Sequence, residues 1–439
     1  MSFLFENIKK SKFLVDFLST FGANISTLLV GVLSSILMVR FLGAAGMGEY
    51  TILTSFSLLF VSLAELGIRQ SSIYLIAKDA SQLNNVLSSN FFIWVISSLI
   101  GVSAFLSILY FKDLNYSFYL VGLACLIIPI TIANKFIDGA MIGTDKIAKN
   151  SKFNFYNGLV KLVSIIVFIV LLDLSVHGAL LVLIVPTFTN LRRKILFLRT
   201  TYKIKFNFKI DVELIKKLIG HGFLYGFALF LMSNQKTIPI YVMSGIIPEV
   251  EVGLYGVGLT FAGLVYQIFS AVAPIVFVKS AKSKDPLAAS LDIQKLMRVM
   301  FVMILFASSV IAVVIKYVLL IMYGQEFIAS SEVTRIMLIG IIFYNIFLVL
   351  NMDMAGKGKP WLAIYTLIPI SIISLVLNYM FIRELGIIGA AISTSFAMAL
   401  ASLLYLYFYS REVNVPILQI ITPKKSDWSF VSNILNKKK

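Results

Sequence analysis

The sequence is poor in charge, cysteine and histidine, and each shortage excludes a class of function. Only 13% of its 439 residues are charged, about half the share of an ordinary globular protein. One cysteine, Cys125, allows neither an internal disulfide nor a thiolate metal site. The two histidines, His177 and His221, lie far apart and without metal-binding spacing. We therefore expect no metal site and no bound cofactor.

What the chain has instead is hydrophobic residues, which make up 59% of it and give a mean hydropathy of +0.93. Uncharged stretches of about 20 residues, the length that crosses a hydrocarbon core, recur along the sequence. The fold class is therefore an all-α integral membrane protein. A hydropathy window predicts twelve transmembrane helices, at 15–39, 50–67, 87–110, 117–137, 155–172, 176–198, 219–245, 254–278, 297–323, 333–353, 360–382 and 387–409.

The distribution of basic residues predicts the orientation of these spans. With the N-terminus in the cytoplasm, 31 of the 38 lysines and arginines fall on cytoplasmic segments and three on outer loops. Cytoplasmic loops carry such an excess, so both termini are predicted to be cytoplasmic. The net charge of +17 then reflects topology and contact with anionic membrane lipids, and we expect no nucleic-acid partner.

The longest basic connection divides the chain into two similar halves. We predict an N-terminal six-helix bundle at 1–200, a basic linker at 201–218, a C-terminal six-helix bundle at 219–410 and a basic tail at 411–439. Residues 46–66 align with 251–271, GTDK at 143–146 with GKGK at 356–359, and Leu174-x3-Gly178 with Leu385-x3-Gly389. Both halves begin on the same side, so the repeat predicts two bundles with a cleft between them.

The first two spans carry a motif that resembles a known family. Residues 40–43 read RFLG, followed by Gly46-x-Gly48-x-Tyr50 and, at the end of the second span, by LGI at 66–68. These residues resemble the bacterial polysaccharide-lipid flippases, O-antigen flippases in particular, of the multidrug/oligosaccharidyl-lipid/polysaccharide (MOP) exporter superfamily. Ala44 departs from the proline that many relatives carry.

That resemblance implies two bundles arranged as a V in the inner (cytoplasmic) membrane of a bacterium. It also implies transport of undecaprenyl-diphosphate-linked oligosaccharides from the cytoplasmic to the periplasmic leaflet. A polysaccharide polymerase and a chain-length regulator are implied as partners, and protons or sodium ions are candidates for driving transport. The resemblance does not name the sugar.

Bases inside the spans are the clearest candidates for a binding site, because such charges usually face a bundle interior or a wet cavity. Lys161 and Lys236 lie deepest, whereas Lys316 and Arg335 are nearer the outer boundary, with Glu332 as a partner for Arg335. Arg40 belongs to the family-like motif. Since one acid accompanies these bases, a central cavity is expected to be cationic and to attract a diphosphate or an acidic sugar.

Polar residues at helical spacing extend this prediction. The predicted cavity residues are Asn24, Asn157, Ser233, Asn345 and Asn378, although stripes of small and polar residues also serve helix packing. Pro239, one turn after Lys236, is the predicted hinge. Glu65 is the candidate for ion coupling, and Arg69 at i+4 is its expected partner in a local ion pair.

Two other functions remain open from the sequence. A cation-coupled multidrug exporter of the same superfamily is expected to place carboxylates in its lumen, and these spans are poor in acids. A membrane polysaccharide polymerase or glycosyltransferase needs paired carboxylates or histidine clusters, commonly on a large outer loop. The outer loops are short here, so a transporter is favoured over an enzyme.

Overall fold

A computed structural model describes residues 12–65, 67–204, 211–283, 285–424 and 427; the side chains of 12–30 and of 267, 270, 271, 274, 275, 278 and 282 lie outside this description. In the described residues the secondary structure is helical, without strands. The chain divides into two compact units, Met1–Phe230 and Leu231–Lys439. We call them unit 1 and unit 2. The predicted boundaries of bundles, linker and tail stay a prediction.

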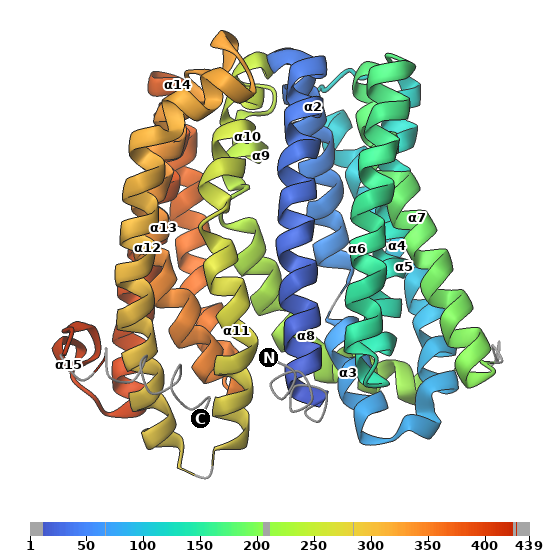
Figure 1. Ribbon diagram of the computed structural model, residues 1–439, viewed down its shortest axis with the longest axis vertical. Coiled ribbons are helices and arrows are strands. Elements are labelled where there is room, and N and C mark those ends of the chain that lie inside the picture. Colours follow the sequence, from blue (N-terminus) through green and yellow to red (C-terminus); the bar gives the residue numbers. More distant parts are fainter. Residues whose placement is uncertain (1–11, 66, 205–210, 284, 425–426, 428–439) are drawn as a thin grey trace, which may run out of the picture. The chain divides into compact units, whose positions relative to one another are not determined.

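The helices of unit 1 are mostly long (Figure 1). They are α2 (Lys12–Ala64), α3 (Ile68–Lys78), the short 3-10 helix η1 (Ala80–Gln82), α4 (Leu83–Phe111), α5 (Phe118–Gly143), α6 (Ile147–Ile165), the π-helical η2 (Ile166–Leu171) and α7 (Ser175–Tyr202). The helix α2 packs against α4, α5, α6 and α7, and α5 packs against α3 and α7. Ser117 caps α5 by accepting a hydrogen bond from the Leu120 N–H, as N-cap serines do.

Unit 2 begins inside α8 (Val212–Asn234), which crosses the boundary between the units. Its other helices are α9 (Ile238–Met243), α10 (Glu249–Gly263), α11 (Tyr266–Lys282), α12 (Pro286–Met322), η3 (Gln325–Phe327), α13 (Ser330–Gly356), α14 (Trp361–Val413) and α15 (Ile417–Ile421). The helix α13 is central, because it packs against α10, α11, α12 and α14.

Eight helical segments among the described residues are long and apolar enough to cross a membrane. Two of the long helices contain a break, at Gly43 in α2 (φ 65°) and at Gly386 in α14 (φ 56°). A straight helix of 53 residues would measure about 80 Å, far more than the hydrocarbon core of about 30 Å. The membrane-protein fold class is thus confirmed, whereas the count of twelve spans and the cytoplasmic termini stay predictions.

The structure supports the internal repeat at two of the aligned sites. Asp145 and Gly358, the third residues of the two aligned tetrapeptides, both have a left-handed backbone, with φ 59° and 78°. The hydrogen bonds that close these turns join corresponding backbone atoms. At the second site, a Cβ on Gly178 would lie 2.8 Å from the Phe168 oxygen, and one on Gly389 would lie 2.1 Å from the Phe381 oxygen.

The start of α8 is held within unit 1. The Ser71 hydroxyl of α3 donates to the Leu218 carbonyl of α8 at 2.5 Å. One turn away, Gly67 (φ 70°) lies against Gly222 so closely that a Cβ on either residue would meet the other's backbone. Only glycine permits both this backbone conformation and this approach.

The far end of unit 2 is held by one arginine of α12. Arg298 makes a bidentate ion pair with Asp427, at 2.7 and 2.8 Å, and both side chains are buried. Its guanidinium also donates to the Ile420 carbonyl at the end of α15 at 2.9 Å. These hydrogen bonds hold the pKa of the Asp427 carboxyl below its ordinary value.

Candidate functional site

The helix that carries Lys236 is interrupted at this lysine. The helix α8 ends at Asn234 and α9 begins at Ile238, with Gln235, Lys236 and Thr237 in the turn between them. Pro239 is in the first turn of α9, where its missing N–H leaves the backbone of the preceding turn without a helical donor. Broken helices at membrane depth are tolerated where they are buried in protein or line a cavity.

Polar side chains hold this turn in place. The Tyr241 hydroxyl donates to the Asn234 side-chain oxygen at 2.7 Å and lies 3.1 Å from the Thr237 hydroxyl. Gln235 is 3% exposed, yet neither its amide oxygen nor its amide nitrogen has a hydrogen-bond partner in the described structure. An unpaired buried amide is costly, so both the amide nitrogen, with its two N–H donors, and the amide oxygen of Gln235 are available to a ligand.

Lys236 itself rests on an aromatic ring. Its Nζ lies 5.5 Å from the ring centre of Tyr266, within the range of a cation–π interaction. Tyr266 begins α11 after a second interruption, at Leu264 and Val265. Within the described residues, no carboxylate lies at ion-pair distance from Lys236, so its charge is not neutralised by an acid.

An aromatic series continues from Tyr266 into the centre of unit 2. The Tyr266 and Tyr344 rings are 6.3 Å apart edge to face, and Tyr344 stacks on Phe347 at 4.9 Å. Asn345, a predicted cavity residue, is 1% exposed, and neither atom of its amide has a partner among the described residues. The Tyr344 hydroxyl likewise has no hydrogen-bond partner among the described residues. Lys236 therefore lies at one end of a region rich in unused hydrogen-bonding groups.

The other predicted polar residues have varied surroundings. Asn378 is fully buried and donates to the Ser374 carbonyl at 2.7 Å, which is a packing contact within α14. Ser233 is exposed, and Asn157 is half-buried with an unpartnered amide oxygen. The side chain of Asn24 lies outside the described residues.

Of the other predicted cations, Lys161 is the one that most resembles Lys236. It is half-buried in α6, one turn before the π-helical η2, with no carboxylate of the described residues at ion-pair distance. Arg40 and Lys316 are exposed. Arg335 is exposed too, and its Nε donates to the Ala312 carbonyl of α12 at 2.9 Å, where the sequence suggests Glu332 as its partner. Whether these cations share one cavity stays a prediction.

The predicted pairing of Glu65 with Arg69 is wrong. Its carboxylate lies 2.6 Å from Lys135 of α5, and the Nε of Arg69 is buried without a partner among the described residues. Spacing of i+4 favours a pair only when both residues lie on one continuous helix. Here Gly67 adopts a left-handed backbone between them, which turns Arg69 away.

The sequence does not predict the burial of two ion-pair clusters, although it places Asp353 beside Lys357 at the end of a span. In unit 1, Lys194 of α7 is 0% exposed, and its ammonium donates to Asp138 at 2.5 Å and to Asn154 at 3.0 Å. The count of basic residues that predicts the topology places this lysine on a cytoplasmic segment. The signal available was its position four residues before the predicted end of a span, with Asp138 close to the end of another.

The second cluster lies in unit 2 around Asp353, which is fully buried. Its carboxylate accepts hydrogen bonds from Ser280 at 2.6 Å, Ser290 at 2.7 Å and Tyr409 at 2.8 Å, and lies 2.9 Å from the Lys357 ammonium. The Asp353 carboxylate is therefore fully hydrogen-bonded by side chains of unit 2. This indicates a structural role for the cluster.

The fold is that of the MOP-superfamily transporters. An inward-facing multidrug resistance MATE family transporter of that superfamily matches with a TM-score of 0.70 and 14% identity, over 91% of this chain and 98% of its own. The lipid II flippase MurJ, in an inward closed conformation, matches with a TM-score of 0.74 and 13% identity, over 97% of this chain and 93% of its own. These likenesses show that the chain has the fold of a membrane transporter.

Sequence similarity assigns the family. Residues 13–278 match the family described as "Polysaccharide biosynthesis protein", and the chain belongs to this family. A relative from Haloferax volcanii, described as "Probable low-salt glycan biosynthesis flippase Agl15", is 24% identical over 115 residues. That match spans 26% of this chain and 24% of the relative. The predicted resemblance to the MOP superfamily is therefore confirmed.

Proposed function

We propose that this protein is a flippase that carries undecaprenyl-diphosphate-linked oligosaccharide repeat units, of an O-antigen or a similar surface polysaccharide, across a bacterial inner membrane. Transport runs from the cytoplasmic to the periplasmic leaflet by alternating access. The family assignment supports this proposal, and so do the similarity to a probable glycan flippase from Haloferax volcanii and the fold shared with a lipid II flippase.

One observation carries the proposal: Lys236 sits in a broken helix without a carboxylate at ion-pair distance among the described residues, beside the unpaired amide of Gln235. An ammonium group binds a phosphate as a point charge, and the amide adds a hydrogen-bond donor. Tyr266, beneath the ammonium, offers a ring on which a sugar face can stack. A drug cation would be repelled by this arrangement. Lys161 is the second cation proposed to contact the diphosphate.

Alternating access needs a flexible point, and Pro239 is the proposed hinge. The chain passes from unit 1 to unit 2 between Phe230 and Leu231, within α8, and the interruption at 235–237 follows directly. Residues at helix ends are typical hinge positions because they absorb changes in φ and ψ. Protons or sodium ions are proposed to drive the cycle, with Glu65 as the coupling residue. A polymerase and a chain-length regulator are the proposed partners.

The test is a deletion strain in which the leaflet holding the lipid-linked repeat unit is measured. We expect repeat units to accumulate on the cytoplasmic side, and wild type to restore delivery. Lys236→Ala and Lys161→Ala at matched expression should not restore it, whereas Lys236→Arg should restore part. Lys152→Ala is the matched control, because the exposed Lys152 makes a similar cation–π contact, 5.8 Å from Tyr156.

Normal outward delivery in the deletion strain, once a redundant flippase has been ruled out, would overturn the proposal and favour the multidrug exporter. Delivery restored fully by both alanine variants would keep the flippase but reject the cationic cargo site.

A further inference from the structure

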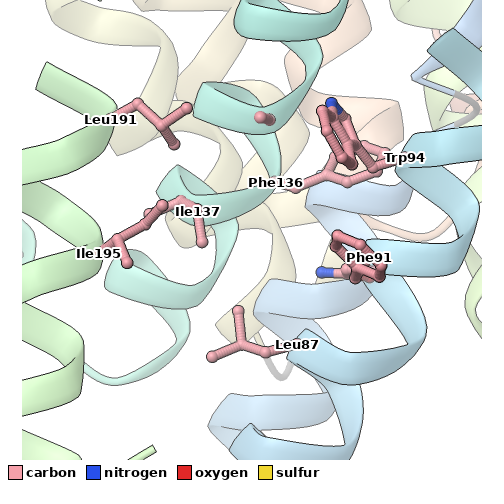
Figure 2. A pocket seen from close by; sticks show the side chains of 9 residues that line it. Leu87, Phe91, Trp94, Phe136, Ile137, Leu191 and Ile195 are labelled. Carbon is pink, nitrogen blue, oxygen red and sulfur yellow. The ribbon is translucent and has the colours of Figure 1, made fainter. Parts of the chain in front are cut away.

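Unit 1 contains an apolar pocket of ≈ 300 Å³ between α4, α5 and α7. Figure 2 shows its walls, with side chains from the three helices around one space. They include Leu87, Phe91 and Trp94 of α4, Phe136 and Ile137 of α5, and Leu191 of α7. The pocket is about twice as large as an apolar cavity of 150 Å³ that stays dry and takes up benzene.

The polar groups in its wall are already used elsewhere. The amide nitrogen of Asn90 donates to the Ser72 hydroxyl at 3.0 Å, and the Trp94 indole N–H donates to the Pro129 carbonyl at 2.8 Å. Water needs two to four polar partners to occupy a cavity, so it gains nothing here. An unfilled apolar space is also unfavourable, because the lining atoms lose their van der Waals contacts. The pocket therefore suits hydrocarbon.

The helices that line the pocket also carry exposed apolar side chains. Leu99 and Val95 of α4 are 65% and 37% exposed, and Phe188 of α7 is 55% exposed. In helices that cross a membrane, such side chains face lipid. The occupant of the pocket is thus drawn from the hydrocarbon chains around unit 1.

The position of the pocket along the helices selects a leaflet. Leu87 and Phe91 belong to the first turns of α4, Ile137 to the last turns of α5, and Leu191 to the second half of α7. With the predicted topology these ends are cytoplasmic. The same turns of α5 and α7 carry the Asp138–Lys194 ion pair, so the walls of the pocket are tied together by a buried contact.

We propose that this pocket binds part of the polyprenyl tail of the lipid-linked cargo while the cargo is in the cytoplasmic leaflet. This inference rests on the proposed function. One leaflet is roughly 15 Å deep, half of the hydrocarbon core. An ordinary phospholipid acyl chain spans this depth when it is extended, so it does not have to bend. An undecaprenyl chain is far longer than the leaflet and has to bend. We expect its methyl branches to fill a pocket with aromatic walls better than a straight chain does.

Trp94 in the pocket wall provides a direct readout. The chain has three tryptophans, so Trp361→Phe with Trp428→Phe leaves Trp94 as the single fluorophore. In nanodiscs we expect a brominated polyprenyl phosphate to quench this fluorescence saturably. A brominated phospholipid at the same bromine content should give only the unsaturable background of the bilayer. Equal quenching by both lipids, or none above background, would overturn the proposal.

A substitution that fills the pocket with a larger side chain should weaken this binding. Ala133 lines the pocket, and Ala133→Phe is expected to weaken the saturable quenching roughly tenfold or more, since lost packing of about 1.4 kcal/mol is a factor of ten. Leu126→Phe is the matched control on the same helix, because Leu126 is 50% exposed and does not line the pocket. Unchanged quenching in Ala133→Phe would also overturn the proposal.

The quenching does not depend on transport, so the two proposals can fail separately. Saturable, selective quenching by a protein that delivers no repeat units in the deletion strain would reject the flippase function and leave a polyprenyl-binding site. Normal delivery without selective quenching would reject the pocket and leave the function.

Discussion

The same contact between two helices is built from different chemistry in the two units. In unit 1, the fully buried Lys194 of α7 forms an ion pair with the partly buried Asp138 of α5. In unit 2, the Tyr405 hydroxyl of α14 donates to the Asn351 side-chain oxygen of α13 at 3.4 Å. The repeat thus preserves the helices and their crossing while one contact is charged and the other neutral.

The register of the repeat makes this comparison residue by residue. Asp138 and Asn351 each lie five residues before the glycine that ends their helix, and Lys194 and Tyr405 each lie sixteen residues after Gly178 or Gly389. The use of positive charge is the same in both units. Each neutralises a buried lysine with an acid, Lys194 with Asp138 and Lys357 with Asp353. Each also has a half-buried lysine, Lys161 or Lys236, without an acid at ion-pair distance among the described residues. The availability of a cation for cargo therefore depends on its partner and not on its depth.

The largest effect on stability is expected from breaking the ion pair between Asp138 and Lys194. Asp138→Ala leaves the Lys194 ammonium buried without its acid, which costs about 3–5 kcal/mol, and the apparent midpoint of thermal unfolding in detergent should fall accordingly. Asp138→Asn with Lys194→Tyr imports the pair of unit 2 and should recover most of the loss. A double variant as unstable as Asp138→Ala would show that the two contacts are not equivalent.

The aligned glycines provide the next prediction. An added Cβ lies 2.1 Å from a backbone oxygen at Gly389 and 2.8 Å at Gly178, and neither oxygen can move without its helix. We expect Gly389→Ala to destabilise by about 1–3 kcal/mol and Gly178→Ala by less, measured by the same unfolding midpoint. As a control, Gly122→Ala should have little effect, because nothing lies within 4 Å of its added Cβ. The reverse order for the two aligned glycines would contradict the geometry.

A smaller effect is expected at Glu65, which pairs with the half-buried Lys135. Both Glu65→Gln and Lys135→Gln should lower stability by about 1 kcal/mol, as pairs near the surface do. The two variants differ in transport: Glu65→Gln is expected to lose the response to an imposed proton or sodium gradient, and Lys135→Gln to keep it because the acid remains. A Glu65→Gln protein that still responds would restrict this pair to a structural role.

The smallest effect concerns the attachment of α15 and pH. Because Arg298 lowers the folded-state pKa of Asp427, the pair stabilises the attached state above the ordinary carboxyl pKa of about 3.9 and loses this contribution as pH falls through the lower folded value. Hydrogen exchange at 417–421 should thus stay slow from pH 8 to about 5 and rise below about pH 4. Asp427→Asn should exchange faster, with little dependence on pH beyond the intrinsic chemistry. Slow exchange in that variant would mean that α15 is held by its apolar contacts.

Sequence reasoning predicted the helices well because hydropathy is a local property. Each predicted span overlaps a helix of the described residues, whereas the role of Lys236 as a cargo cation stays a prediction. The interruption at 235–237 was harder, since Pro239 alone signals it and many transmembrane helices tolerate proline. Glu65 shows the limit: its partner Lys135 is 70 residues away, and only tertiary structure brings the two together.

The burial of the charged clusters could not be predicted for a related reason. A lysine near a span end reads as a topology signal, and whether it is buried depends on the helices that surround it. Lys194 becomes a core residue because Asp138, Asn134 and Asn154 come from α5 and α6. The apolar pocket of unit 1 has no sequence signal at all, because apolar residues on spans face lipid, protein or empty space without a change in pattern.

The contact between Gly67 and Gly222 has a consequence for biosynthesis. Unit 1 includes residues up to Phe230, so a ribosome that has delivered residues 1–200 has not yet supplied Gly222, which lies against Gly67, or Leu218, which accepts the Ser71 hydrogen bond. The packing of unit 1 is therefore complete only when the start of α8 has been synthesised. A protein split for co-expression as two fragments should therefore be cut after this segment, because a cut within the basic linker would separate the two glycines before they meet.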